Sequence, residues 1–431
     1  MQLARYTPEQ LEVGMWIENY IPKGLECAPV GPTGFLLTEQ HIRRIKEEGR
    51  DWVWIHKNRG LLRIRKHSPS ASMPEKTTPP PTQAPANSTA MNTDQLLDYL
   101  DNLQPGHDIE PKEDVQKELF RAADIIKIAN EQMQYILTHI SKGGTLDHSQ
   151  MRTLTEISDQ ITRSIYANHD ALLSVCLIKQ VDNTTYQHSI NVAVLLALAG
   201  RRMGYETKQL EALALGGLLH DTGKSKVPIN ILNKPGRLTN SEYAIIKSHV
   251  QAGTHLIAHH HTLSKITRDA ITQHHERFDG SGYPLRLKGA EISEHGRLTA
   301  IADVFDAIIS KRPYHQPLNP ISGLKRILSW SEHHFCTYTA HQFIRAIGLY
   351  PIGTLLRLES GLLGVVIEQN PRSLLLPVLR IVFNARKSTA VNSPYVLDLE
   401  KHPQQILGYE NPEKWGINPM LHLIGGNCDS K

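Results

Sequence analysis

The stretch that decides the fold opens with LLHDTGK (218–224) and closes with HHERFDGSGYP (274–284), with His249 in a helix-like segment between them. The apolar run that precedes His220 and Asp221 predicts a buried helix that ends at this pair. A buried imidazole beside a buried carboxylate is unfavourable unless both have partners. The two side chains are therefore either hydrogen-bonded within the core, or they are ligands.

Gly223 and Lys224 favour ligands. Glycine lets the backbone turn or approach a ligand closely, and a lysine ammonium is a point charge suited to phosphate. The alternative for Lys224 is a surface lysine that follows a helix.

The closing group adds two adjacent imidazoles, His274 and His275, and a Gly-x-Gly-Tyr-Pro turn. Consecutive residues of a helix diverge by about 100°, so the two histidines can serve two neighbouring metal positions. Histidine and carboxylate side chains thus occur together at both ends of this stretch, which coincidence explains poorly. Glu276 and Arg277 are expected to be solvated or paired with each other.

Composition restricts the class of protein. The 431 residues allow one to three domains, and a net charge of +4 predicts no attraction to a nucleic-acid polymer or a membrane surface. Four widely spaced cysteines predict reduced thiols in a cytoplasmic protein. No signal peptide is visible, and the most apolar segments fall short of the ~20 residues that span a bilayer.

The pattern changes several times along the chain. Residues 1–66 carry short β-like pieces at 15–17 and 52–56 around a helix-like stretch at 38–48, which predicts a small α+β domain. Residues 67–93 are rich in Pro, Ser and Thr and cannot bury enough apolar surface to fold, which predicts a linker.

Helical spacing of apolar residues dominates residues 94–350, with a motif-bearing core at 183–350 and a break at 143–144. Core faces explain its apolar stripes, with a homodimer contact as the alternative. Residues 351–431 predict a small β-rich appendage that becomes irregular from Glu400, where Trp415 anchors the tail. The expected fold is multidomain, with a central all-helical bundle.

In combination, these motifs resemble the HD-GYP branch of the HD-domain phosphohydrolases. The resemblance rests on the two groups above and His249, and it continues in YQHSINV (186–192), ILNKPGRLTNSE (231–242), ADVFDA (302–307) and RPY (312–314). Residues 1–66 likewise resemble an uncharacterised domain that often precedes HD-GYP domains, for which a docking or regulatory role is expected. The resemblance implies an HD-type helical bundle and a phosphodiesterase that acts on cyclic di-GMP.

At the family positions, seven residues are implied as metal ligands: His188, His220, Asp221, His249, His274, His275 and Asp303. Five imidazoles and two carboxylates suit iron or manganese, with nickel or zinc as alternatives, and are too rich in nitrogen for magnesium or calcium. Seven ligands exceed the needs of one ion, so two divalent ions are expected, with Asp221 as their bridge. His220 and Asp221 would thereby take part in catalysis, in which a hydroxide activated by both ions attacks phosphorus.

The resemblance also assigns residues around the ions. Lys224 would offset charge on the phosphate oxygens, and Asp306 would orient a ligand or a water. Arg312 would bind guanine or phosphate and Asp182 would contact the base, although a helix-ending turn is the alternative explanation of RPY. In the family, the loop of Gly280, Gly282, Tyr283 and Pro284 is implicated as a contact surface for diguanylate cyclases; as its alternative it is only a rigid turn.

One family position departs from the pattern. Some members hold a third metal with a glutamate four residues before the first histidine, where this chain has Thr184. Two ions, and linear pGpG rather than GMP as the product, are therefore expected. The alternatives are a catalytically weak cyclic-dinucleotide-binding adaptor that signals through the GYP loop and the N-terminal domain, or a hydrolase of another cyclic dinucleotide. The intact ligand set argues against the adaptor, whereas the choice of substrate is open because metal ligands report only the type of reaction.

Overall fold

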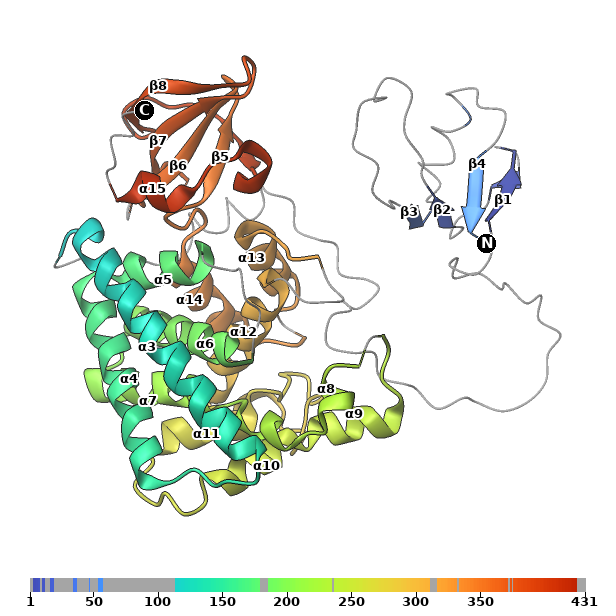
Figure 1. Ribbon diagram of the computed structural model, residues 1–431, viewed down its shortest axis with the longest axis vertical. Coiled ribbons are helices and arrows are strands. Elements are labelled where there is room, and N and C mark those ends of the chain that lie inside the picture. The colour runs from blue at the N-terminus through green and yellow to red at the C-terminus, as the bar shows by residue number, and fades with distance from the viewer. Residues whose placement is uncertain are drawn as a thin grey trace. The chain divides into compact units, whose positions relative to one another are not determined.

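The structure is a computed structural model of the chain (Figure 1). It describes residues 113–178, 185–310 and 316–424, apart from single positions at 235, 332, 371, 372 and 374. Nearer the N-terminus it describes residues 3–7, 10–11, 16–18, 34–36, 46 and 53–56. The chain divides into two compact units, Met1–Thr78 and Pro79–Lys431.

The N-terminal unit contains a four-stranded antiparallel sheet in the order β1-β4-β2-β3. Its strands are β1 Leu3–Tyr6, β2 Trp16–Glu18, β3 Gly34–Leu36 and β4 Val53–His56. The β-like pieces predicted at 15–17 and 52–56 overlap β2 and β4. The helix predicted at 38–48, apart from Lys46, and the linker at 67–93 lie outside the described residues, so the α+β fold stays a prediction.

The second unit is mainly helical (Figure 1). It begins with three helices, α3 Val115–Ser141, α4 His148–Ala167 and α5 His169–Ile178. The turn at Gly143–Gly144 separates α3 from α4, as predicted. Asp147 begins α4 through a capping box with Gln150, in which each side chain binds the other residue's backbone N–H.

The helices that follow carry the predicted ligands. They are α6 Thr185–Arg202, α7 Thr207–Leu219, α10 His249–Leu256, α11 Lys265–Gln273 and α12 Glu294–Ile309. Other elements join them: the 3-10 turn η2 Thr222–Lys226, α8 Ile229–Leu232, α9 Asn240–Lys247 and the 3-10 turn η3 Gly289–Glu291. Two further helices, α13 Pro320–Ser329 and α14 Thr337–Ile347, complete the bundle.

Helix α6 lies in the middle of this bundle and packs against α7, α12 and α14. Its residues from Ser189 to Gly200 are all buried, as expected of a helix that is apolar on every side. Helices α6 and α7 approach each other closely where Gly217 faces the backbone of Ala193. The apolar run at the end of α7 is therefore a core element, and it brings His220 into the interior. No helix within the described residues has the length and apolar character needed to cross a membrane.

The C-terminal part is a five-stranded antiparallel sheet in the order β8-β7-β6-β5-β9. The strands are β5 Leu355–Leu358, β6 Leu362–Glu368, β7 Val378–Asn384, β8 Thr389–Asp398 and β9 Ile406–Tyr409. The sheet lies next to α5 in Figure 1, where Gln369 donates a hydrogen bond to Asp170 at 3.1 Å. The predicted β-rich appendage is thus present.

The expectation that the chain becomes irregular from Glu400 is wrong. Strand β9 pairs with β5, the 3-10 turn η4 Pro412–Trp415 and the short helix α15 Pro419–Leu423 follow it, and such short elements form only through pairing and packing. Trp415 does anchor the tail: its ring lies 5.3 Å from that of Phe383, and its indole N–H donates to Glu410 at 3.0 Å.

Gly217→Ala should destabilise the bundle by about 1–3 kcal/mol, because the added methyl overlaps the α6 backbone at Ala193. Chemical or thermal unfolding measures the loss. Gly253→Ala on α10 is the matched control, because there the added methyl meets its nearest atoms at 3.6 Å, an ordinary contact. Equal stability of the two variants would contradict the close approach of α6 and α7.

Candidate metal centre

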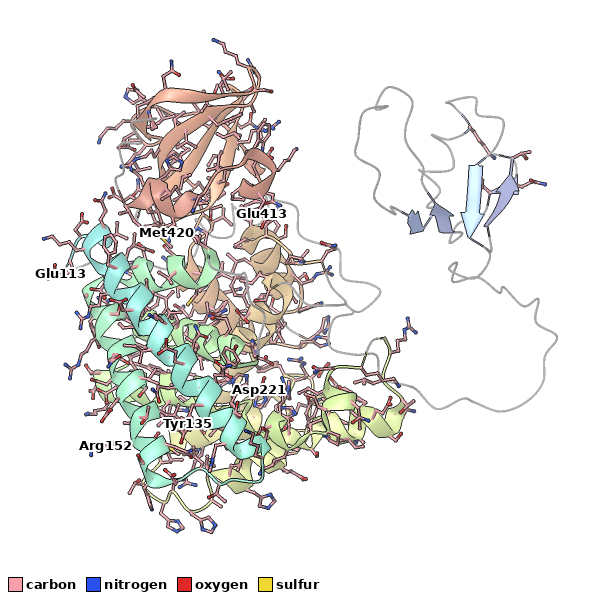
Figure 2. All side chains as sticks on the ribbon, viewed as in Figure 1. Glu113, Tyr135, Arg152, Asp221, Glu413 and Met420 are labelled. Carbon is pink, nitrogen blue, oxygen red and sulfur yellow. The ribbon has the colours of Figure 1, made fainter. Side chains whose placement is uncertain are left out.

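The seven side chains predicted as ligands come from separate parts of the helical bundle, and they meet in its interior. Figure 2 labels Asp221 among the side chains of this unit. Of the seven predicted ligands, His188 lies on α6 and Asp303 on α12. The others lie at helix ends: His220 and Asp221 follow α7, His249 begins α10, and His274 and His275 follow α11. Every one of them except His275 is buried.

The ligand atoms fall into two groups, and within each group they all lie within 4.8 Å of one another. One group is Asp221, His249, His274 and His275; the other is His188, His220 and Asp303. The sequence did not predict which of the seven residues belong to which group.

The carboxylate of Asp221 faces both groups. Its Oδ1 lies 3.4 Å from Nε2 of His249 and 3.8 Å from Nε2 of His274. Its Oδ2 lies 3.5 Å from Nε2 of His188 and 3.4 Å from Nε2 of His220. A bridging ligand needs one oxygen directed to each side, and this side chain has that arrangement.

The backbone fixes the orientation of three of the imidazoles. Each donates its Nδ1 proton to the carbonyl three residues earlier: His220 to Gly217 at 2.8 Å, His249 to Ile246 at 2.6 Å and His274 to Ile271 at 2.9 Å. With the proton on Nδ1, the Nε2 lone pair of each ring is directed into the cluster. This is the tautomer that a metal ion requires.

The cluster contains more lone pairs than protons. Nε2 of His220 and Oδ1 of Asp221 are buried without a hydrogen-bond partner, although buried polar atoms are nearly always satisfied. Nε2 of His249 lies 3.2 Å from Nε2 of His274, so two lone pairs face each other. Cations would satisfy these atoms together, and the donor set therefore fits metal ions.

Burial keeps most of the imidazoles neutral. Burial, reinforced by the neighbouring His220 and His249, lowers the pKa of His274 to about 3. Burial likewise lowers the pKa of His249 and of His275 below the ordinary value. Neutral imidazole is the form that binds metals. These rings are therefore ready for metal ions at neutral pH.

The carboxylate of Asp221 stays ionised despite its burial. Burial alone would raise its pKa, but the neighbouring Lys224 ammonium holds that pKa well below its usual range. Nζ of Lys224 donates to Oδ2 of Asp221 at 2.5 Å. Gly223 makes the turn possible, since a side chain there would overlap the carbonyl of His249. The close approach predicted for this glycine is thus made to a helix backbone.

Asp306 orients His188 from one helical turn beyond Asp303. Its Oδ2 lies 2.7 Å from Nδ1 of His188, while its Oδ1 accepts from Nδ2 of Asn191 at 2.8 Å. Nε2 of His188 lies 3.0 Å from Oδ1 of Asp303. Burial alone would lower the pKa of His188, but hydrogen bonds to both carboxylates raise it to about 9. Asp306 thus contacts a predicted ligand.

The expectation that Glu276 and Arg277 are solvated or paired with each other is wrong. Glu276 is 1% exposed, and its carboxylate accepts backbone N–H groups of Leu285 at 2.7 Å and Leu287 at 3.0 Å. Arg277 is 9% exposed, and its guanidinium carbon lies 5.4 Å from the centre of the Phe335 ring. A charged pair in a glycine-rich turn usually signals exposure, so the sequence carried no sign of this burial.

The GYP loop folds back onto the cluster of predicted ligands. Gly282 is required because a side chain there would overlap the backbone of Glu276 and Arg277, and Gly280 has φ +83°, which favours glycine. The backbone N–H of Tyr283 donates to the carbonyl of His275 at 3.1 Å, and the two rings stack at 4.6 Å. Besides forming a rigid turn with Pro284, the loop therefore supports a predicted ligand.

Several of the positions discussed lie outside the described residues. These are Asp182, Thr184 and the RPY motif at 312–314, which includes Arg312. The contacts predicted for the base and for guanine or phosphate, and the missing third-metal ligand, stay predictions.

Comparison with known proteins agrees with the site. A model of the HD domain matches residues 174–335, and a model of a domain of unknown function (DUF3391) matches residues 3–151. The cyclic di-GMP phosphodiesterase PA4108 of Pseudomonas aeruginosa is 32% identical over 431 residues, which cover 99% of this chain and 97% of the relative. The chain therefore belongs to the HD-GYP family of HD-domain phosphohydrolases.

Other relatives match a smaller part. The 3'3'-cGAMP-specific phosphodiesterase 1 of Vibrio cholerae is 39% identical over 163 residues, which are 36% of this chain and 36% of the relative. Among solved structures, Bd1817, an HDG"Y"P protein from Bdellovibrio bacteriovorus, has 15% identity and a TM-score of 0.45, over 79% of this chain and 98% of that one.

Asp306→Asn should weaken metal binding about 10–100-fold, because the amide cannot hold Nδ1 of His188 as the carboxylate does. Elemental analysis after dialysis against a chelator series measures the affinity. Asp269→Asn is the control: this carboxylate is also buried, but it pairs with Lys265 away from the cluster. Identical metal retention in the two variants would show that Asp306 does not act through His188.

Proposed function

We propose that this protein is a metal-dependent phosphodiesterase that hydrolyses cyclic di-GMP to linear pGpG. The observation that carries the proposal is the carboxylate of Asp221, which faces two separate groups of ligand atoms. The full-length similarity to a cyclic di-GMP phosphodiesterase of Pseudomonas aeruginosa supports the substrate. The product pGpG follows from Thr184, which offers no carboxylate for a third ion.

Each group of ligand atoms would hold one divalent transition metal ion, iron or manganese in preference to nickel or zinc. His188, His220 and Asp303 would hold one ion, His249, His274 and His275 the other, and Asp221 would be shared. When bound, such ions act as Lewis acids and bring the pKa of a water molecule towards neutrality.

The chain's own residues prepare the site for this chemistry. Asp306 holds the ring of His188 in one orientation, and last-turn carbonyls do the same for three other rings. Lys224 keeps the Asp221 carboxylate ionised. Its side chain is 20% exposed, so the ammonium can also reach a phosphate oxygen. The buried ligands cannot reorganise when charge develops on the phosphate, which favours the transition state.

We also propose the domain limits and partners that the sequence predicted. Residues 1–66 would form an α+β docking or regulatory domain, 67–93 a linker, 94–350 the phosphodiesterase region and 351–431 the appendage, all in the cytoplasm. Arg312 and Asp182 would contact the nucleotide. Leu285, next to Pro284, is 66% exposed, which supports the GYP loop as a surface for diguanylate cyclases. A homodimer would use the exposed faces of the helices.

A second candidate is a hydrolase of another cyclic dinucleotide. The support is the 3'3'-cGAMP-specific enzyme of Vibrio cholerae, which is 39% identical over 163 residues. The metal ligands are compatible with either substrate, because the ions that they would hold contact a phosphate and not the bases. The catalytically weak adaptor is disfavoured, since binding alone does not require two complete ligand groups.

Asp221→Ala should remove both ions and lower turnover of cyclic di-GMP at least 100-fold, because this carboxylate faces both ligand groups. The wild-type protein, loaded with manganese or iron, is expected to yield pGpG. Elemental analysis and chromatography of the products measure both effects. Lys208→Gln, a change at an exposed side chain on α7, is the control. Full turnover by Asp221→Ala would refute the mechanism.

The ratio of kcat/KM for cyclic di-GMP to that for 3'3'-cGAMP decides between the two substrates. We expect at least a tenfold preference for cyclic di-GMP, by analogy with the relative that matches the whole chain. Chromatography of both reactions with the same enzyme preparation measures the ratio. A preference of that size for 3'3'-cGAMP would favour the second candidate.

A further inference from the structure

A lysine ammonium lies over two tyrosine rings at the edge of the metal centre. Lys247 is the last residue of α9, and its Nζ lies 4.9 Å from the centre of the Tyr243 ring and 5.8 Å from that of Tyr283. The Tyr283 ring in turn stacks on His275 at 4.6 Å. Tyr283 alone therefore separates this ammonium from a metal ligand.

Lys247 differs from the other lysines of this stretch. Lys224 donates to Asp221, Lys226 to the carbonyl of Ile140, and Lys234 to Glu242. For the partly buried Lys247, no hydrogen bond or ion pair of the ammonium is found within residues 113–424 as far as the structure describes them. Its N–H groups therefore remain able to bind an anion.

The position of this ammonium is set by two separate elements. Tyr243 and Lys247 are four residues apart on α9, and such a pair alone is common on a helix surface. Tyr283 comes from the GYP loop, where its backbone N–H bond to His275 fixes it. The faces of aromatic rings attract cations, so the two rings hold the lysine beside the centre. The predicted ligand His249 is only two residues further along the chain, so the backbone also holds Lys247 close to the cluster.

A cyclic dinucleotide has two negatively charged phosphodiester groups, and the metal ions and Lys224 can contact only one of them. Only one of the two can be at the ligand cluster during hydrolysis. Lys224 is already bonded to Asp221, so the second phosphodiester needs a further cation. Arg312, which we propose as a contact of the nucleotide, lies outside the described residues, and Lys247 is the candidate that the structure describes. Lys247 is close to the cluster and does not belong to it, and it is free of any carboxylate found in the described residues.

We propose that Lys247 binds the phosphodiester that is not being hydrolysed, and that Tyr243 and Tyr283 position it for this contact. The inference rests on the proposed hydrolysis of a cyclic dinucleotide. It makes Lys247 a residue that recognises the cyclic substrate, and it gives the tyrosine of the GYP loop a part in substrate binding. A lysine that merely covers two aromatic rings would affect stability and leave KM unchanged.

The test compares Lys247→Gln and Lys247→Arg with the wild-type protein, with kcat and KM measured for cyclic di-GMP. Lys247→Gln should raise KM about tenfold, which is the size of one hydrogen bond to a charged group, with kcat within twofold. Lys247→Arg keeps the charge and should restore KM to within about threefold. Lys208→Gln is the control for loss of a lysine charge elsewhere. An unchanged KM for Lys247→Gln overturns the proposal.

Bis(p-nitrophenyl) phosphate provides a second measurement, because it is a phosphodiester with no second phosphate. Loss of Lys247 should change its KM less than twofold. If Lys247→Gln instead lowers kcat on both substrates, or loses metal in elemental analysis, the lysine acts through His249 and the proposal is overturned.

The role of Lys247 can be tested even if the proposed phosphodiesterase activity is refuted. A metal-loaded wild-type protein that hydrolyses neither compound refutes the phosphodiesterase. Equilibrium binding of cyclic di-GMP by calorimetry then decides the role of Lys247. Binding that weakens about tenfold in Lys247→Gln supports the contact, and unchanged binding overturns it.

Discussion

The structure depends on one buried carboxylate that is surrounded by imidazoles. Asp221 is 1% exposed, and both of its oxygens lie close to histidine nitrogens. An isolated charge in such a place would be strongly unfavourable. It is tolerated because Lys224 donates a hydrogen bond to it. Metal ions held by the surrounding imidazoles would also bind its oxygens and offset its charge. The helices that carry these side chains must therefore keep their positions relative to one another. The apolar packing of α6 against α7 contributes to this.

Helix ends determine the orientation of the ligands. His220 follows α7, His274 follows α11, and His249 follows the end of α9 after one intervening residue. The last carbonyls of a helix lack partners within the helix, and each of these rings donates Nδ1–H to one of them. The histidines thus satisfy the helix ends and present Nε2 to the cluster. This is why ligands placed just after helices appear repeatedly in this chain.

The helical bundle was predictable from the sequence, because apolar spacing is a local property. The resemblance to the HD-GYP family named the seven residues that meet in the cluster, and their role as metal ligands stays a prediction. The burial of Glu276 was not predictable, since it depends on backbone N–H groups nine and eleven residues later. Strand β9 escaped prediction for a similar reason: its four residues carry no clear alternation and form a strand only against β5. Lys247 stands beside Tyr243 at helical spacing, but its contact with Tyr283 joins residues that are far apart in sequence.

The register between α6 and α12 is a further constraint on the centre. His188 and Asn191 are separated by about one turn of α6, as are Asp303 and Asp306 on α12. Asp306 binds both of these α6 residues, whereas Asp303 binds His188 but not Asn191. A slip of one residue would rotate either helix face by about 100° and separate all of these contacts at once. The polar pairs therefore select one alignment of two largely apolar helices, which apolar packing alone specifies less strictly.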